Sequence, residues 1–371
     1  MAIRRITLAD LVFGEPLRWD LFGAAEGANA PAAAAPVLQK GALIAPGPQL
    51  DTLLAAGLYA EANPPPSVLH SLNHVNQRLE RMLLELRKQS TADAELRDIA
   101  RELIAAVELD TDIALASIFL NQIAGLYAVR HCVETAIVVV LIARAMHKSD
   151  SEILTATAAA LTMNVGMVRQ IEGFQCKDCA LSSEERAVVR RHPHESAELL
   201  RGAGVIDQEW LNYVLLHHEN DDGSGYPEGK LGDEIPQNAK LIGLADRYCA
   251  HVSARNYRRS LLPSIALRNL FVDGDAPVDP VLASLFVEQI GKYPPGSLVR
   301  LANGEVGVVA HRGAGGQVTV HALRTADGKT LPAAAIRHCA EPEYAIDEAL
   351  HEDQVGVRFS MKHIWGELAS L

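Results

Sequence analysis

Residues 215–227 read Leu-Leu-His-His-Glu-Asn-Asp-Asp-Gly-Ser-Gly-Tyr-Pro, a segment that places two adjacent histidines immediately before a glycine-rich turn. His217 and His218 offer imidazole nitrogens, which are the commonest protein ligands for transition metals. Gly223 and Gly225 permit positive φ angles, so the part that ends in Gly-Tyr-Pro predicts a tight loop. On spacing alone a second interpretation stays open: the histidines end a helix and, about 100° apart around its axis, point in different directions.

The residues around this segment predict an α-helical domain over 67–290. Apolar side chains recur at three- and four-residue spacing, for example over 72–86, which is typical of a helix with one buried face. Residues 128–146 are apolar nearly all round, and this predicts a central, buried helix. The Ser-Ser-Glu-Glu segment at 182–185 is a capping box that starts another helix. Asp207 is the predicted N-cap of the helix that ends at the histidine pair.

Two smaller regions flank the helical domain. Residues 1–66 predict an N-terminal accessory domain with a helix over 50–59 and a stiff triple-proline linker at its end, because consecutive prolines favour an extended backbone. Residues 291–371 alternate short apolar segments with turn signals, which predicts a small β-rich C-terminal extension. The predicted fold class is therefore mainly α, with a small domain before the helical bundle and a small β extension after it.

Charge and cysteine content exclude several classes of function. The net charge of −12 over 371 residues argues against binding to nucleic acid or to anionic membranes, because both require a positive face. The sequence has no segment long and apolar enough to span a bilayer. It begins without the apolar core of a signal peptide and contains five cysteines, so we expect a cytoplasmic protein. Cys176 and Cys179 have ligand-like spacing, but without a second pair nearby a zinc or redox role is the lesser interpretation.

Histidine or acidic residues also fall on successive predicted helices. They are His131, His192, the pair His217 and His218, and Asp246. A helical bundle that points such ligands inward from several helices is a common way to build a two-metal hydrolase centre. Their order, together with the motif at 217–227, resembles the HD-GYP family, which comprises bacterial relatives of the HD-type metal phosphohydrolases that act on cyclic di-GMP. The resemblance covers roughly residues 120–300.

This resemblance implies a set of site residues. The implied metal ligands are His131, His192, His217, His218 and Asp246. Arg255 and Arg258 are implied to approach the phosphates of the ligand. Asp222, Tyr226 and Pro227 belong to the loop that is implied to face the substrate or protein partners.

The main departure from the family lies at 161–167, where the sequence is Leu-Thr-Met-Asn-Val-Gly-Met. The family has Leu-x-His-Asp-x-Gly-Lys at this place, so Met163, Asn164 and Met167 stand for the histidine, the aspartate and the lysine. A thioether is a soft ligand that suits iron(II), manganese and magnesium poorly, and a neutral amide cannot bridge two cations as a carboxylate does. Two dications about 3.5–4 Å apart repel each other by roughly 16 kcal/mol at an effective dielectric constant near 20. A full two-metal centre is therefore not expected, and no residue is assigned as catalytic.

One metal position would survive this loss. Three histidines and a water molecule make a reasonable single site, so His192, His217 and His218 are expected to hold at most one divalent iron, manganese or nickel ion. Cys249 is a further departure, because the family usually places an aspartate there.

The leading hypothesis is a degenerate HD-GYP protein in cyclic di-GMP signalling. It would be weak or inactive as a hydrolase and would act as a receptor, or as an interaction module that meets signalling proteins through its Gly-Tyr-Pro loop. The alternative is a working metal-dependent cyclic di-GMP phosphodiesterase with a one-metal or altered centre. A third hypothesis is a structural helical module whose histidines are core residues. The metal content of the purified protein separates the third hypothesis from the others, because a structural module holds no metal.

Overall fold

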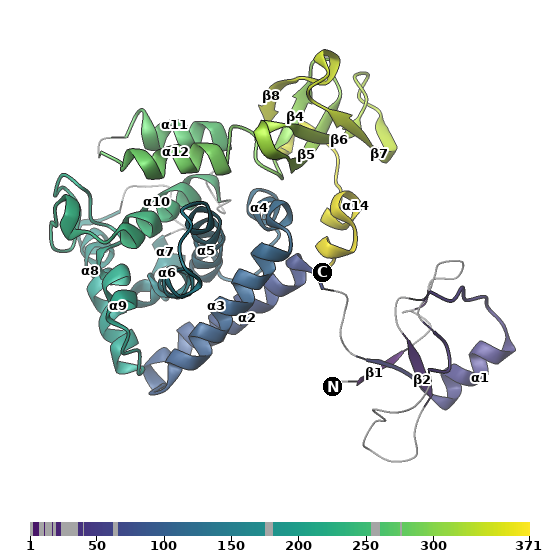
Figure 1. Cartoon of the computed structure of the whole chain (residues 1–371), viewed down its shortest axis with the longest axis horizontal. Helices are drawn as coiled ribbons and strands as arrows, with labels where there is room; N and C mark the ends of the chain where they lie inside the picture. Colours follow the sequence, from purple (N-terminus) through teal and green to yellow (C-terminus); the bar gives the residue numbers. More distant parts are fainter. Residues whose placement is uncertain are drawn as a thin grey trace. The chain divides into compact units, whose positions relative to one another are not determined.

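The computed structural model of the chain describes residues 3–6, 11, 17, 20–23, 36–39, 41–61, 66–174, 181–253, 260–274 and 277–371 (Figure 1). The chain divides into two compact units, Met1–Pro66 and Ser67–Leu371. The second unit contains the long helices and the C-terminal strands, and it holds the candidate site.

The first unit is built on a small antiparallel sheet with the strand order β1-β3-β2. Its elements are β1 (Ile3–Ile6), β2 (Leu21–Gly23), α1 (Pro48–Ala56) and β3 (Leu58–Glu61). Gly57 ends α1 with a φ of 94°, a conformation that glycine adopts without steric cost. The predicted helix over 50–59 is therefore wrong at its end, because the chain leaves the helix at Gly57 and Leu58 and Tyr59 belong to β3.

The second unit begins with a helical bundle. Its helices are α2 (Val68–Glu85), α3 (Ala92–Leu109), α4 (Thr111–Phe119), α5 (Tyr127–Ala145), α6 (Asp150–Thr162), α7 (Ile171–Phe174), α8 (Ser183–Gly202), α9 (Gln208–Leu216), α10 (Gln237–Val252), α11 (Pro263–Phe271) and α12 (Pro280–Gln289). Short 3-10 turns are η2 (Leu86–Lys88), η3 (Val165–Met167) and η4 (Gly232–Glu234). α5 is buried along most of its length, and α3, α6 and α10 all pack against it. The prediction of a central buried helix is thus confirmed.

The helices that carry the histidines start at the predicted caps. Ser182 and Glu185 form a reciprocal capping box at the start of α8. The side chain of Asp207 accepts hydrogen bonds from the backbone N–H groups of Glu209 at 3.0 Å and Trp210 at 3.3 Å. Such caps satisfy N–H groups that have no partner inside the helix. Both predictions are confirmed, and the caps determine where along each helix the histidines fall.

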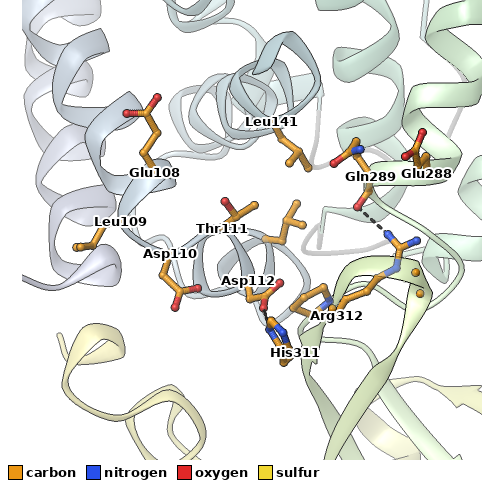
Figure 2. A pocket seen from close by; sticks show the side chains of 15 residues that line it. Glu108, Leu109, Asp110, Thr111, Asp112, Leu141, Glu288, Gln289, His311 and Arg312 are labelled. Carbon is orange, nitrogen blue, oxygen red and sulfur yellow. Dashed lines mark hydrogen bonds and ion pairs between the residues drawn. The ribbon is translucent and has the colours of Figure 1, made fainter. Parts of the chain in front are cut away.

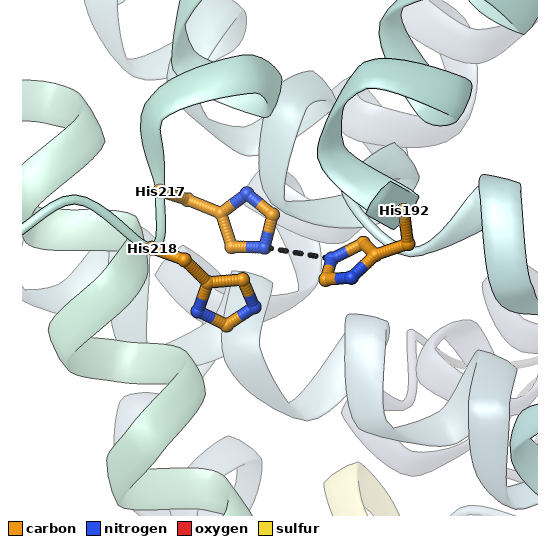
Figure 3. A group of neighbouring side chains, drawn as sticks. All are labelled: His192, His217 and His218. Carbon is orange, nitrogen blue, oxygen red and sulfur yellow. Dashed lines mark hydrogen bonds between the residues drawn. The ribbon is translucent and has the colours of Figure 1, made fainter. Parts of the chain in front are cut away.

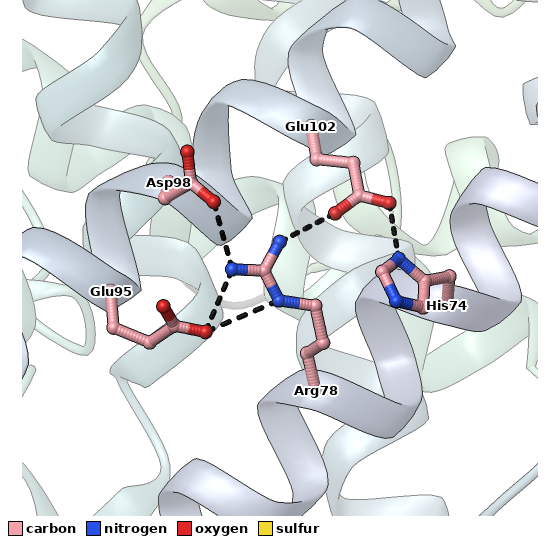
Figure 4. Close-up of polar contacts among 5 residues, drawn as sticks. All are labelled: His74, Arg78, Glu95, Asp98 and Glu102. Carbon is pink, nitrogen blue, oxygen red and sulfur yellow. Dashed lines mark hydrogen bonds and ion pairs between the residues drawn. The ribbon is translucent and has the colours of Figure 1, made fainter. Parts of the chain in front are cut away.

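A network of charged side chains joins α2 to α3 (Figure 4). The guanidinium of Arg78 on α2 donates to Glu95 at 2.7 Å, to Asp98 at 2.8 Å and to Glu102 at 2.7 Å. Glu102 also contacts Nδ1 of His74 at 2.6 Å. Three carboxylate partners fix the position of one guanidinium more firmly than the single partner of an isolated surface ion pair does. The network therefore helps to hold α2 and α3 side by side.

Five antiparallel strands follow the bundle in the order β7-β6-β5-β4-β8. They are β4 (Leu298–Leu301), β5 (Val306–Arg312), β6 (Val318–Arg324), β7 (Thr330–His338) and β8 (Ile346–Leu350), and the short helices α13 (Glu352–Val355) and α14 (Met361–Trp365) come last. The chain then returns to the start of the bundle, where the Ser67 hydroxyl group contacts the backbone oxygen atoms of Leu368 at 3.1 Å and Ser370 at 2.5 Å. The predicted fold, mainly α with a small C-terminal β extension, is confirmed. Among the described helices, none combines the length and the apolar character that crossing a bilayer requires.

Candidate metal and ligand site

Three histidines from two neighbouring helices converge at one point of the bundle (Figure 3). His192 lies in the middle of α8, and His217 and His218 come directly after α9. Their ligand atoms all lie within 4.8 Å of one another, and the ring centroids of His217 and His218 are only 4.0 Å apart. The two adjacent rings therefore do not point in different directions, and that interpretation of the spacing is wrong.

Backbone hydrogen bonds select the tautomer of two of these rings. Nδ1 of His192 lies 2.6 Å from the carbonyl oxygen of Val189, and Nδ1 of His217 lies 2.7 Å from that of Val214. A carbonyl oxygen can only accept, so each Nδ1 carries the proton and each Nε2 keeps its lone pair. The two Nε2 atoms face each other at 3.3 Å. Two facing lone pairs repel unless a cation or a shared proton lies between them.

The histidine cluster fits one metal ion. Two nitrogens that bind one ion at about 2.0–2.1 Å with a tetrahedral angle lie about 3.3–3.4 Å apart, and the observed spacing of the Nε2 atoms of His192 and His217 is 3.3 Å. The pKa of His192 is lowered to about 3, mainly by burial and to a smaller extent by the neighbouring His217. Burial also lowers the pKa of His217 and of His218. The rings are therefore neutral at neutral pH, which is the state in which imidazole binds metals.

The other two predicted ligands form a separate pair next to the cluster. Nε2 of His131 on α5 contacts Oδ1 of Asp246 on α10 at 2.7 Å, and both side chains are buried. Burial alone would raise the pKa of Asp246, but His131, His218 and His217 together lower it. Within the described residues, the group of side chains close enough to share one ion contains the three histidines and neither member of this pair. The carboxylate of Asp246 is thus already engaged by an imidazole.

The turn that departs from the family pattern packs directly against the cluster. Met163, Asn164 and Met167, at the end of α6 and in η3, are 0%, 2% and 6% exposed. A Cβ atom on Gly166 would lie 2.8 Å from the backbone oxygen of His192, so only glycine permits this approach. The buried turn beside His192 therefore carries two thioethers and a neutral amide.

The amide of Asn164 has one unsatisfied atom. Its Oδ1 is buried and has no hydrogen-bond partner among the described residues. The thiol of Cys132 lies against the same asparagine; burial raises the pKa of Cys132 to about 12, and the contact with Asn164 acts in the opposite direction. The thiol therefore stays protonated and adds no negative charge to this part of the site. Burial also raises the pKa of Cys249 well above its usual value.

A second glycine brings α10 onto the end of α9. A Cβ atom on Gly243 would lie 2.0 Å from the backbone oxygen of His217, so the two helices touch at main-chain distance. Asp246 lies one turn further along α10, which explains why its carboxylate ends up beside the histidines. This glycine was not recognised from the sequence, since its role depends on a contact between residues 26 positions apart.

The Gly-Tyr-Pro loop is held from inside by one buried carboxylate. Glu219 accepts hydrogen bonds from the backbone N–H groups of Glu228 at 2.6 Å, Gly229 at 3.1 Å and Lys230 at 3.0 Å. A Cβ atom on Gly225 would lie 2.5 Å from the backbone nitrogen of Asn220, so the loop folds back on its own start. Glu219 was not singled out in the sequence, although it follows the histidine pair directly.

Asp222 and Tyr226 have different places in this loop. The carboxylate of Asp222 is exposed and accepts hydrogen bonds from the backbone N–H of Ser224 at 3.0 Å and from its hydroxyl at 2.6 Å. It shapes the loop rather than facing the histidines. The ring of Tyr226 stacks on His218 with centroids 4.7 Å apart, and Pro227 beside it is half-buried.

Two arginines near Tyr226 were not predicted as site residues. The guanidinium carbon of Arg190, on α8, lies 4.9 Å from the centroid of the Tyr226 ring. Arg247 on α10 donates from Nη1 to Asn220 at 2.9 Å and so supports the loop. The pKa of Tyr226 is raised, mainly by burial and to a smaller extent by Asp246, whereas Arg190 and Arg247 act to lower it. The only sequence signal for Arg190 was its position two residues before His192.

Some predicted residues lie outside the described part of the chain. These are Arg255 and Arg258, which were implied to approach the ligand phosphates, and Cys176 and Cys179 of the ligand-like cysteine pair.

A separate cleft of about 900 Å³ lies between α4, α12 and the hairpin that follows β5 (Figure 2). Its walls include Glu108, Asp110 and Asp112, and none of its lining residues belongs to the histidine cluster. His311 reaches across it to form an ion pair with Asp112. An acidic lining repels phosphates, so this cleft does not suit an anionic nucleotide.

Known proteins are similar to this chain over its helical domain. A sequence profile of the HD domain family matches residues 78–282. The cyclic di-GMP phosphodiesterase PA4108 of Pseudomonas aeruginosa is 30% identical over 221 residues, which cover 60% of this chain and 53% of that protein. The cyclic di-GMP phosphodiesterase response regulator RpfG of Xanthomonas campestris pv. campestris is 33% identical over 141 residues, which cover 38% of this chain and 37% of that protein. The chain thus spans about half, or less, of the length of these relatives.

A solved structure shares the fold. Bd1817, an HDG"Y"P protein from Bdellovibrio bacteriovorus, is similar with a TM-score of 0.50 and 13% identity, over 77% of this chain and 99% of that chain. At this level of identity the likeness shows the fold alone. The family profile, by contrast, covers more than half of the sequence, and the histidine pair and the Gly-Tyr-Pro loop lie inside it. This chain therefore belongs to the HD domain family and carries a domain of the HD-GYP type.

Proposed function

We propose that this protein binds cyclic di-GMP through its HD-GYP domain and hydrolyses it weakly or not at all, so that it acts as a receptor or interaction module. The ligand class is taken from relatives whose names describe cyclic di-GMP phosphodiesterases. The observation that carries the loss of hydrolysis is the buried turn with Met163, Asn164 and Met167 beside His192. This turn offers neither an anionic oxygen nor a cation at the place where the two would act on a phosphodiester.

The histidines support one metal ion and not two. His192, His217 and His218 would hold a single iron, manganese or nickel ion, and such an ion supplies a Lewis acid and an activated water when it is bound. A second ion about 3.5–4 Å away would be repelled by roughly 16 kcal/mol at an effective dielectric constant near 20. The neutral amide of Asn164 does not offset that repulsion. Asp246 is engaged by His131 at 2.7 Å.

Binding depends on residues that are retained. The Tyr226 ring lies over His218, and Glu219 fixes the loop that presents it. In this proposal the outer surface of the Gly-Tyr-Pro loop meets signalling proteins, and ligand bound beneath Tyr226 changes that surface. The odd number of cysteines favours a reducing compartment, so we place this role in the cytoplasm.

The alternative function is an active phosphodiesterase with a one-metal centre. It is favoured by one observation, the two Nε2 lone pairs of His192 and His217 that face each other at 3.3 Å, because this geometry is prepared for a cation. Each 1.4 kcal/mol of lost transition-state stabilisation lowers a rate about tenfold. Loss of the charged groups at 164 and 167 would thus reduce turnover by several orders of magnitude and leave binding in place.

Metal analysis, calorimetric titration with cyclic di-GMP and a phosphodiesterase assay on the same preparation test the proposal. We expect about one metal ion per chain, measurable binding and no significant turnover with iron, manganese or nickel. His217→Ala should lose the metal. His194→Ala should retain it, because His194 is an exposed histidine on α8, the helix that also carries His192. Turnover that disappears in His217→Ala would favour the alternative. A protein without metal and without binding would be a structural module.

A further inference from the structure

Arg190 reaches the candidate site through the tyrosine of the Gly-Tyr-Pro loop. Its guanidinium carbon lies 4.9 Å from the centroid of the Tyr226 ring. The same ring stacks on His218 at 4.7 Å with an interplanar angle of 28°. Tyr226 thus contacts both the arginine and the histidine cluster, so a positive charge from α8 is held next to the place where a metal ion would bind.

This contact leaves the hydrogen-bond donors of Arg190 free for a ligand. A guanidinium that stacks through its face keeps its N–H groups available at the edges. Among the described carboxylates, none forms an ion pair with Arg190, whereas the adjacent Arg191 contacts Glu195 at 3.5 Å. The side chain of Arg190 is also exposed. An exposed planar fork without a carboxylate partner matches the bidentate geometry of a phosphate group.

Among the residues that the structure describes around the histidine cluster, few others carry a positive charge. The chain carries a net charge of −12, and Met167 adds no charge to the turn beside the histidines. Arg247, a second guanidinium near Tyr226 in the described part of the chain, already donates to Asn220 at 2.9 Å and supports the loop. An anionic ligand at the histidine cluster therefore requires a local positive group, and Arg190 is placed to supply it.

We infer that Arg190 binds a phosphate group of the cyclic dinucleotide, with the Tyr226 ring holding its guanidinium beside the histidine cluster. The inference rests on the proposed function, because it takes a phosphodiester as the ligand of this site. It assigns phosphate binding to a residue of α8 that lies outside the histidine motif and the Gly-Tyr-Pro loop. Arg190 contributes to affinity, and the three histidines hold the metal independently of it.

Calorimetric titration of the full-length, metal-loaded protein with cyclic di-GMP tests this assignment. Arg190→Gln removes the charge and keeps most of the side-chain length, and Arg190→Lys keeps the charge but loses the planar fork. Arg191→Gln is the matched control, since Arg191 is a neighbouring exposed arginine that pairs with Glu195. The metal content and the unfolding midpoint of each variant are measured in parallel.

We expect Arg190→Gln to weaken binding by about tenfold or more, the size expected for one charge-assisted hydrogen bond, and Arg190→Lys to weaken it less. The control should bind within about twofold of the wild type, and all variants should keep their metal. Tyr226→Leu should add little to the loss in Arg190→Gln, because coupled residues are not additive. Wild-type affinity in Arg190→Gln would overturn this inference and leave the proposed function intact, whereas no binding by the wild type would overturn both.

Discussion

Replacement of Asn164 by aspartate would restore a negative charge at the turn beside the histidines. The Asn164 side chain is 2% exposed, and its Oδ1 has no hydrogen-bond partner among the described residues. The substitution therefore changes the charge without removing a hydrogen bond from that oxygen. Its effect on stability should come mainly from one carboxylate placed in a buried position, together with the loss of the amide donor that contacts the Cys132 thiol.

The expected size follows from this burial. An uncompensated buried charge costs about 3–5 kcal/mol of folding free energy, so the metal-free Asn164→Asp protein should unfold at a clearly lower urea concentration than the wild type at pH 7. Burial raises the pKa of a carboxyl group above its unfolded-state value of about 3.9. The loss of folding free energy should therefore be complete above the raised pKa of the new carboxyl group. It should disappear as the pH falls through that pKa towards about 4.

Bound metal should reduce this loss of stability. A carboxylate at 164 can bind and bridge cations, so manganese should stabilise Asn164→Asp more than the wild type and raise the metal content above about one ion per chain. Urea unfolding with and without manganese, together with metal analysis, measures both quantities. Met163→Leu is the control, because an exchange of similar volume in the core costs less than about 1.5 kcal/mol and adds no charge. Equal stability of Asn164→Asp and wild type without metal, or unchanged metal content with it, would refute the reasoning.

The other predictions concern the loop, the helix caps and the ligand set. Glu219→Gln should loosen the Gly-Tyr-Pro loop, because an amide nitrogen would face backbone donors. Hydrogen exchange at the three donor amides should accelerate by about tenfold to a hundredfold. Unchanged exchange would exclude the role of Glu219 in holding the loop. Asp207→Ala should destabilise the second unit by about 1–3 kcal/mol through loss of the N-cap and of the ion pair with Arg97 at 2.8 Å. Burial alone would raise the pKa of Asp207, but the hydrogen bond from Arg97 and the cap lower it. The stabilisation by Asp207 is therefore present above the unfolded-state pKa of about 3.9 and is lost in acid. A difference in unfolding free energy between wild type and Asp207→Ala that stayed constant in urea unfolding from pH 7 to about 2 would contradict this prediction. His131→Ala should retain the metal that His217→Ala loses, as measured by metal analysis of the purified variants, and equal loss in both would place His131 among the ligands.

The elements of the bundle follow from signals that act within a few residues. The capping box at Ser182 and the N-cap at Asp207 could be read directly, because a cap depends on residues three positions apart. The buried helix α5 could be read from its apolar composition. The end of α1 could not, since Gly57 turns an apparently helical segment into the strand β3, and that strand is stabilised by pairing with distant residues.

The sequence allowed the motifs of the site to be recognised, but it did not reveal which side chains contact one another. The histidine pair and the altered turn are visible in the sequence, because a family pattern has fixed spacing. The pairing of His131 with Asp246 joins residues 115 positions apart, and the stacking of Arg190 on Tyr226 depends on how a loop folds over a helix. Asp222 also carries a local signal, because an aspartate two residues before a serine commonly forms the turn seen here; its predicted contact with the ligand stays a prediction.

Gly166 and Gly243, the two glycines that bring the helices together, matter for engineering of the site. Any side chain at Gly166 or Gly243 would collide with the main chain at His192 or His217, so the close backbone approach around the cluster depends on these two glycines. Exchanges at Met163, Asn164 and Met167 leave both glycines in place, so they test the proposed loss of hydrolysis at the side chains themselves.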